Sequence, residues 1–220
     1  MPLLPILIII IILIVSFESG GWEALTAVGT IGVALLAIWG EWITEFLAGP
    51  KINIKLRNIE GNPTTRTNGI KTIYYHLSVV NERNWSLAKR VNIFCTTILR
   101  KFPNKEFLRE PIIRSMPLEW SYSEIYGGAY RNIKTEDLCN LGFLDEKSGR
   151  FEINLLFCPN NVNKFIIPQE IVRLEFMAEG DNFSQKIPYY LEIVWDGEWI
   201  FDGEKMRDHL KIMEIQNLNQ

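Results

Sequence analysis

The chain contains two histidines and three cysteines, and their spacing limits the catalytic and metal chemistry that it can support. His76 alternates with Leu77 in a pattern typical of a strand, so its side chain is expected on the face opposite Leu77. His209 follows Asp208 directly, and adjacent residues do not face each other on a helix. The cysteines are far apart and lack the C-x-x-C spacing of a zinc ribbon: they are Cys95, Cys139 and Cys158. We therefore expect no metal site and no cofactor.

The sequence also lacks the common catalytic motifs. It has no H-E-x-x-H, no G-x-S-x-G turn, no phosphate-binding loop and no G-x-G-x-x-G. Ser78 or Ser86 could act as a nucleophile only with an acid and a histidine from elsewhere in the chain, and nothing singles out such a set. We therefore expect a protein that is not an enzyme and has no catalytic residues.

Aromatic and basic side chains offer a candidate ligand surface. Trp85 lies close in sequence to three bases, Arg83, Lys89 and Arg90. Exposed rings can stack on bases or sugars, and basic side chains can contact anions. Further aromatic candidates are Trp120, Trp195 and Trp199. The alternative is that the tryptophans fill the core and the bases lie on a solvated edge.

Charge is distributed unevenly along the 220 residues. The chain has 23 bases and 26 acids, but residues 1–50 contain no base and only four of the acids. Residues 51–220 therefore hold 23 bases and 22 acids, a net charge of +1. This distribution argues against a fully soluble protein, a nucleic-acid binder held by bulk charge and a disordered acidic tail. We expect no nucleic-acid partner.

Two apolar segments precede the polar part of the chain. As helices, residues 3–17 would span about 22 Å and residues 22–47 would exceed the ~30 Å of the hydrocarbon core. Residues 18–21 break the two segments, so we predict a transmembrane hairpin over residues 1–49 in contact with the lipid bilayer. Two alternatives stay open: the first segment is a cleaved signal peptide, or the second is an interfacial amphipathic helix.

Basic residues predict the orientation of the hairpin. The turn is flanked only by acids, whereas Lys51, Lys55 and Arg57 follow the second segment directly. The positive-inside rule then places the domain of residues 50–220 in the cytoplasm, as part of a multi-pass protein of the inner (cytoplasmic) membrane. The absence of a disulfide framework agrees with a reducing compartment.

Small residues recur along one face of the second apolar segment. The helix-packing candidates are Thr26, Gly29, Thr30, Ala34 and Ala37. Small side chains let helix backbones approach closely, so we expect this stripe to pack against another helix. That helix is either the first segment of the same chain or, through self-association, the second segment of another copy.

From Lys51 onward the hydrophobic period becomes that of strands. Alternation predicts strands within residues 51–57, 73–79, 91–97, 151–157, 172–178 and 189–195. Short strands with polar turns predict a mainly β domain, an antiparallel β-sandwich of immunoglobulin-like type, with a small β-barrel as the alternative. Residues 100–146 lack regular alternation and are expected to form an insertion between edge strands.

Turn and helix signals add detail to this domain. Asp196-Gly197 lies between two aromatic-rich runs and predicts a tight hairpin that joins Trp195 to residues 199–201. We predict a short helical turn at residues 135–138 and a short helix at residues 205–209. Residues 210–215 could form a last strand or continue that helix.

Five stretches carry a resemblance to known proteins: Gly29–Leu35, Gly49–Lys51, Tyr74–Asn81, Ala88–Val91 and Val194–Trp199. In this pattern the chain resembles uncharacterised small prokaryotic membrane proteins with an N-terminal transmembrane hairpin and a C-terminal immunoglobulin-like β-sandwich. The resemblance covers most of the chain and implies a membrane-tethered sandwich, but no activity. In arrangement only, the chain is also similar to antiphage effectors that join a membrane hairpin to a ligand-binding β-barrel, and that likeness carries over no nucleotide-binding residue.

Two functions are compatible with these features. The first is a membrane-anchored, non-catalytic binding, scaffolding or sensor module, whose protein or small-ligand partner the sequence does not identify. The second is a ligand-gated membrane effector, in which partner binding to the β domain makes the helices oligomerise and disturb the bilayer.

Overall fold

A computed structural model of the chain describes residues 26, 29–34, 37, 40, 49–112, 114–122 and 129–218. The chain divides into two compact units, Met1–Gly49 and Pro50–Gln220.

In the first unit, residues 29–34 are helical. The hydroxyl of Thr30 donates a hydrogen bond of 2.9 Å to the carbonyl of Thr26, a contact that helical residues four apart can make. No helix within the described part of the chain is long and apolar enough to cross a membrane. The expected segment 3–17 and much of 22–47 lie outside the described residues, so the hairpin stays a prediction.

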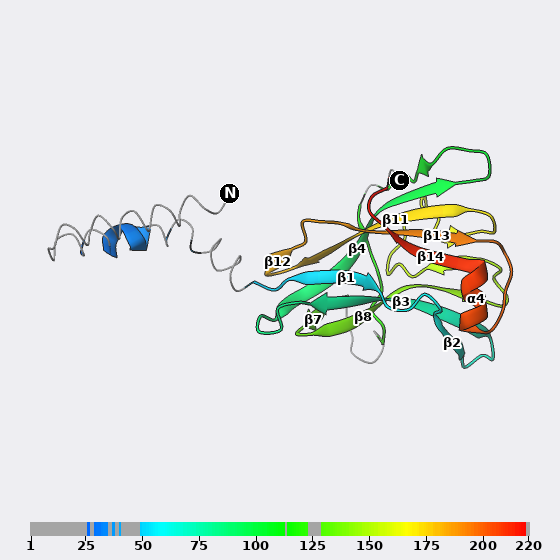
Figure 1. The fold of residues 1–220 in the computed structure, drawn as a ribbon, viewed down its shortest axis with the longest axis horizontal. Coiled ribbons are helices and arrows are strands. Elements are labelled where there is room, and N and C mark those ends of the chain that lie inside the picture. Colours follow the sequence, from blue (N-terminus) through cyan, green and yellow to red (C-terminus); the bar gives the residue numbers. More distant parts are fainter. Residues whose placement is uncertain are drawn as a thin grey trace. The chain divides into compact units, whose positions relative to one another are not determined.

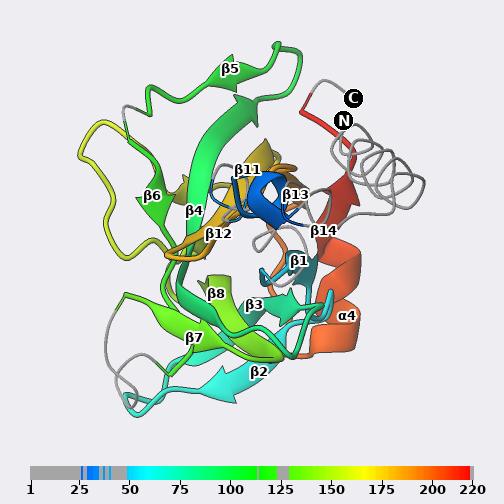
Figure 2. The ribbon, with the colours of Figure 1, turned by 90° about the vertical axis from the view of Figure 1, so that its left-hand side faces the viewer.

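The second unit is mainly antiparallel β structure in two sheets, as the alternation predicts (Figures 1 and 2). The first sheet has the order β1–β3–β8–β9–β10, with β2 also paired to β3. Its strands are β1 Ile52–Leu56, β2 Asn62–Thr65, β3 Lys71–Asn81, β8 Glu136–Asp145, β9 Phe151–Ile153 and β10 Phe165–Ile166.

The second sheet has the order β14–β13–β11–β4–β5, with β6 and β7 paired to β4 and β12 paired to β11. Its strands are β4 Ala88–Lys101, β5 Leu108–Arg109, β6 Met116–Pro117, β7 Arg131–Ile133, β11 Ile171–Gly180, β12 Phe183–Ser184, β13 Tyr189–Trp195 and β14 Leu210–Ile215. A short helix, α4 (Gly203–His209), precedes β14. The expected helix at residues 205–209 is therefore confirmed, and residues 210–215 form a strand.

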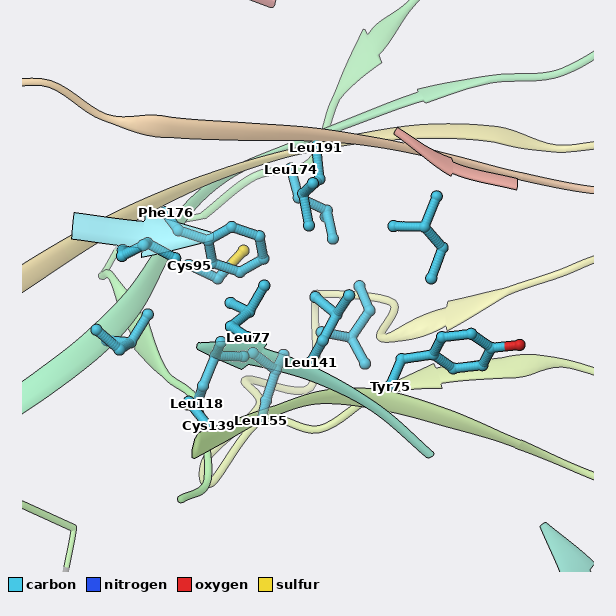
Figure 3. Packing of buried hydrophobic residues seen from close by; sticks show 14 of the residues in the cluster. Tyr75, Leu77, Cys95, Leu118, Cys139, Leu141, Leu155, Leu174, Phe176 and Leu191 are labelled. Atoms are coloured by element: carbon cyan, nitrogen blue, oxygen red, sulfur yellow. The ribbon is translucent and has the colours of Figure 1, made fainter. Parts of the chain in front are cut away.

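The hydrophobic core lies between the two sheets (Figure 3). Leu77 of β3 points from the first sheet toward Leu174, Phe176 and Leu191 of the second, and Tyr75 of the same strand is also fully buried. Each fully buried large apolar side chain contributes roughly 1.5–3 kcal/mol relative to an exposed one. The period-2 pattern of the sequence thus encodes the face of each strand that is buried.

Two predictions for residues 100–146 are wrong. This stretch is no insertion between edge strands, because its strand β8 is an internal strand of the first sheet that pairs with both β3 and β9. Residues 135–138 form no helical turn, since β8 begins at Glu136. The register shifts between Tyr75 and His76 of β3, and a bulge of this kind breaks the period-2 pattern in the sequence.

The predicted hairpin at Asp196-Gly197 is also wrong. Residues 199–201 form no strand; instead, β13 pairs with β14, from Trp195 opposite Leu210 to Tyr190 opposite Ile215. The side chain of Asp196 accepts a hydrogen bond of 2.8 Å from the backbone N–H of Glu198, a local turn contact. The Asp-Gly pair therefore turns the chain toward α4, and the partner of β13 comes only after that helix.

Candidate binding surface

The loop between β3 and β4 presents the most exposed tryptophan among the described residues. Trp85 is 70% exposed, whereas the strands on both sides of the loop are mostly buried. Its neighbour Leu87 is also exposed. A large apolar ring in water has a free-energy cost, so such a residue on a well-formed loop is a candidate contact for a partner.

Asn81, the last residue of β3, holds this loop in place. Its side chain is only 3% exposed and makes four hydrogen bonds. Oδ1 accepts from the backbone N–H groups of Lys51 (3.2 Å) and Arg83 (3.1 Å), and Nδ2 donates to the carbonyls of Ser86 (2.6 Å) and Ile133 (3.2 Å). Because both loop ends are bonded to one buried amide, Trp85 is presented on a fixed backbone.

The turn between β11 and β12 supports the loop from the second sheet. The side chain of Asn182 donates to the carbonyl of Leu87 and accepts from the backbone N–H of Lys89, both at 2.9 Å. The backbone N–H of Asp181 donates to the carbonyl of Lys89 at 3.0 Å. A Cβ on Gly180 would lie 2.7 Å from that same carbonyl oxygen, so only glycine allows this close approach.

Arg90 lies beside Tyr130 at the same end of the domain. Its φ of 49° is in the left-handed region, and its backbone N–H donates to Oδ1 of Asn132 at 2.9 Å. Its guanidinium carbon is 4.7 Å from the ring centroid of the exposed Tyr130, a cation–π distance. Its Nε lies 4.0 Å from a carboxylate oxygen of Asp181. The bulge of β4 between Ala88 and Val91 thus turns Arg90 outward.

These residues form one group, which we call the Trp85 surface: Arg83, Trp85, Leu87, Lys89, Arg90 and Tyr130. The structure brings together the four residues of the group that the sequence suggested, Arg83, Trp85, Lys89 and Arg90. In the β3–β4 loop and the β11–β12 turn the acids are Glu82, which pairs with Lys51 at 2.6 Å, and Asp181. The surface is therefore aromatic and basic, a composition suited to an anionic partner with an apolar part.

The other predicted ligand-surface tryptophans do not join this group. Trp120 and Trp195 are each 1% exposed and belong to the core. Their indole N–H groups donate inside the domain, to the carbonyls of Ala129 (3.2 Å) and Glu198 (3.0 Å). Trp199 packs partly buried against the core. Burial removes Trp120 and Trp195 as candidates for an exposed ligand surface, because burying so large a ring is more favourable than exposing it.

The helix-packing candidates of the first unit, Thr26, Gly29, Thr30, Ala34 and Ala37, are all helical and exposed. A Cβ on Gly29 would meet no atom within 4 Å.

The two histidines are not part of the Trp85 surface: His76 lies five residues before Asn81 in β3, and His209 is the last residue of α4. His76 is on the outer face of β3, as expected, where its Nδ1 is 3.1 Å from Nδ2 of Asn62. Burial, reinforced by Arg57, lowers the pKa of His76. Nδ1 of His209 lies 2.9 Å from Oδ2 of Asp196, so His209 pairs with a residue 13 positions earlier and not with its neighbour Asp208.

The side-chain partners of the two histidines are the amide of Asn62 and the carboxylates of Asp196 and Glu198. Ser78 donates to Oε1 of Glu136 at 2.7 Å and not to a histidine. Across the described ranges, no three His, Cys, Asp or Glu side chains are placed to hold a metal ion.

Sequence reasoning missed Asn81, Tyr130 and Asn182 as parts of the surface. Asn182 and Lys89 are 93 residues apart, and Asn132 and Arg90 are 42 residues apart, so no local sequence pattern could predict their contacts. The one available signal was an asparagine at the end of a strand, a residue type that often closes turns.

Comparison with known proteins gives no matching family model, no matching curated protein and no matching solved structure.

Proposed function

We propose that this chain is a membrane-anchored, non-catalytic binding or scaffolding module whose β domain, an immunoglobulin-like sandwich, lies on the cytoplasmic side of the inner membrane. Residues 1–49 would supply the anchor, as a transmembrane hairpin. The observation that carries the binding role is the Trp85 surface. An exposed ring and three bases are held there by hydrogen bonds of the side-chain amides of Asn81 and Asn182.

A fixed backbone supports binding because little conformational entropy is lost when a partner docks on it. Asn81 and Asn182 between them form hydrogen bonds with both sides of the loop. The bases provide attraction at a distance, and the ring provides apolar contact area. This division of roles fits recognition rather than turnover.

Site-specific photo-crosslinking in cells tests the binding role. A photoreactive amino acid replaces Trp85 in the full-length chain, and the matched control carries it in place of Phe102, an exposed ring beyond the other end of β4. Light-dependent adducts, with lipid or protein, are expected at position 85 and not at 102. Substituting Arg83, Lys89 and Arg90 by Gln should reduce them. The absence of any adduct at position 85 would contradict the role.

Carbonate extraction and protease access test the anchor and the orientation. The full-length chain is expected to stay in the membrane pellet at alkaline pH, and its β domain should resist protease added to the periplasmic side. Purified full-length protein is also offered a panel of esters, phosphates and peptides. Turnover that a single substitution abolishes would contradict the non-catalytic assignment.

The exposed stripe of small residues favours a second candidate function. In that alternative, partner binding to the β domain makes helices of several copies pack through Gly29 and Ala34 and disturb the bilayer. Leu at both positions should then reduce the oligomer size of the full-length protein and its toxicity on overexpression. Unchanged size and toxicity would exclude this mechanism.

A further inference from the structure

The polypeptide enters the β domain directly beside the Trp85 loop. The backbone N–H of Lys51, the residue after Pro50, bonds to the same Asn81 oxygen as the backbone N–H of Arg83. The backbone N–H of Glu82 donates to the carbonyl of Lys51 at 2.8 Å. Since consecutive residues span at most about 3.6 Å, the backbone of Trp85 lies within about 15 Å of Lys51.

Several strands reach this end of the domain. β1 begins here and β3 ends here, because Ile52 pairs with Asn81. β12 and β7 also lie at this end (Figure 1), and Figure 2 shows it facing the viewer. The Trp85 surface therefore occupies the end of the domain through which the N-terminal segment connects.

We infer that the Trp85 surface docks on the anionic headgroup layer of the same bilayer that holds residues 1–49. The inference rests on the proposed function, because it requires the membrane anchor. From Leu47, the last residue of the apolar segment, to Pro50 the chain spans at most about 11 Å. One headgroup layer is roughly 5–8 Å thick. The tether thus keeps this end within reach of the headgroups.

The chemistry of the surface matches that layer. Tryptophan and tyrosine rings prefer the boundary between lipid and water, where an apolar face and a polar group are both satisfied. Trp85 and Tyr130 are exposed at this end, together with the apolar Leu87. Lys89 and Arg90 add exposed positive charge, which attracts the phosphates of anionic lipids.

The short tether favours lipid over a protein partner. A protein that bound Trp85 would have to be recruited from solution. The lipid surface is already there at a high effective concentration, so a weak attraction is enough to orient the domain. The consequence is a domain that stands in one orientation on the membrane.

Fluorescence quenching in nanodiscs tests the inference with the full-length chain. Cys158, the thiol that is not fully buried, is replaced by Ser, and a fluorophore is attached after Trp85→Cys. The matched control is Phe102→Cys at the far end of β4, whose 14 residues extend about 45 Å. The discs contain phosphatidylcholine with about 30% phosphatidylglycerol, or phosphatidylcholine alone, and a lipid with a nitroxide headgroup serves as quencher.

We expect several-fold stronger quenching at position 85 than at 102, and more with the anionic lipid. Arg83→Gln, Lys89→Gln and Arg90→Gln together should remove the lipid dependence. Leu87→Cys provides a second probe of the same surface and should behave like position 85. Both probe positions are exposed, so the label leaves the core intact.

Other outcomes overturn the inference in distinguishable ways. Equal quenching at positions 85 and 102 in a chain that resists carbonate extraction would overturn docking and leave the anchor standing. A chain that does not insert into the discs would overturn the anchor as well. Photo-crosslinks from position 85 to a protein and not to lipid would overturn the choice of partner alone.

Discussion

Arg100 and Glu170 form an ion pair inside the β domain, with Nη1 of Arg100 lying 2.9 Å from Oε1 of Glu170. Glu170 is 1% exposed, and its second oxygen accepts from the backbone N–H of Ile167 at 3.1 Å. Arg100 also pairs with Glu110 at 2.6 Å and donates to the carbonyl of Phe165. The pair therefore links the segment before β11 to β4, an internal strand of the second sheet.

Arg100→Met should destabilise the domain by about 3–5 kcal/mol, because it leaves the carboxylate of Glu170 buried without its partner. The double variant Arg100→Met/Glu170→Gln should recover part of the loss, since no buried charge then remains at position 170. Urea denaturation of the full-length chain in detergent measures both. The control is Arg207→Gln, which breaks the exposed pair of Arg207 with Glu60 and should cost less than about 1 kcal/mol. Similar losses for Arg100→Met and Arg207→Gln would contradict the structural role of the buried pair.

Asn81→Ala should loosen the Trp85 loop and destabilise the domain by about 2–4 kcal/mol, because four hydrogen-bonding groups lose their partner. Asn81→Asp keeps the acceptor for the N–H groups of Lys51 and Arg83, but it loses both donors and places a buried carboxylate against the carbonyls of Ser86 and Ile133, so its loss should be at least as large. Hydrogen exchange of the amides of Lys51 and Arg83 distinguishes the two variants. Relative to the other buried amides of the domain, these two should exchange faster in Asn81→Ala and not in Asn81→Asp. Unchanged exchange in Asn81→Ala would show that the loop is held by other contacts.

The sequence predicts strands well where one face of a strand is buried and the pairing is regular. β1, β3, β11 and β13 all fall within or around the expected alternating segments. β8 escaped detection because its bulge opposite Tyr75 and His76 shifts the apolar residues out of period 2. The hairpin predicted at Asp196-Gly197 was wrong for a different reason. These two residues do form a local turn, but the strand that pairs with β13 is β14, which comes later in the chain and is brought there by tertiary packing.

The Trp85 surface could likewise be predicted only in part from the sequence. Arg83, Trp85, Lys89 and Arg90 are close in the sequence, and a short loop brings them together. Their supports, Tyr130 and Asn182, come from distant loops that only the folded domain places beside them. The burial of Trp120 could not be read from its neighbours, since tryptophan is as suited to a core as to a surface.

The three thiols should differ sharply in reactivity. Burial raises the pKa of Cys95 to about 12 and raises that of Cys139 well above its usual value. Cys158 is only half-buried, although burial raises its pKa as well. Because the thiolate is the reactive form, a thiol reagent at pH 8 should label one cysteine slowly in the folded full-length chain and three after unfolding. Cys158→Ser should abolish the labelling of the folded protein. Rapid labelling of two or more thiols would contradict the burial of Cys95 and Cys139.

The two histidines should titrate in opposite directions from the ordinary value of about 6.5. The hydrogen bond that His209 donates to Asp196 raises the pKa of His209, while burial lowers that of His76. Burial acts to raise the pKa of Asp196, but hydrogen bonds from the backbone N–H of Glu198 and from His209 lower it. Since the chain has only two histidines, an NMR titration of the full-length protein in detergent should resolve one midpoint above and one below that value.

The pH dependence of the free energy of unfolding should follow from the directions of these two pKa shifts. A raised histidine pKa stabilises the fold below about 6.5, and this contribution is lost as the pH rises through the pKa of folded His209. It is lost again in acid, when the pH falls through the lowered pKa of Asp196. The stability advantage of the wild type over His209→Gln should therefore be largest between about pH 4 and 6.5.

His76 gives the opposite trend: its unfolded form binds the proton more readily, so the wild type should lose stability relative to His76→Gln as the pH falls below about 6.5. Urea denaturation at several pH values measures both differences, and parallel trends in the two variants would contradict the assigned environments.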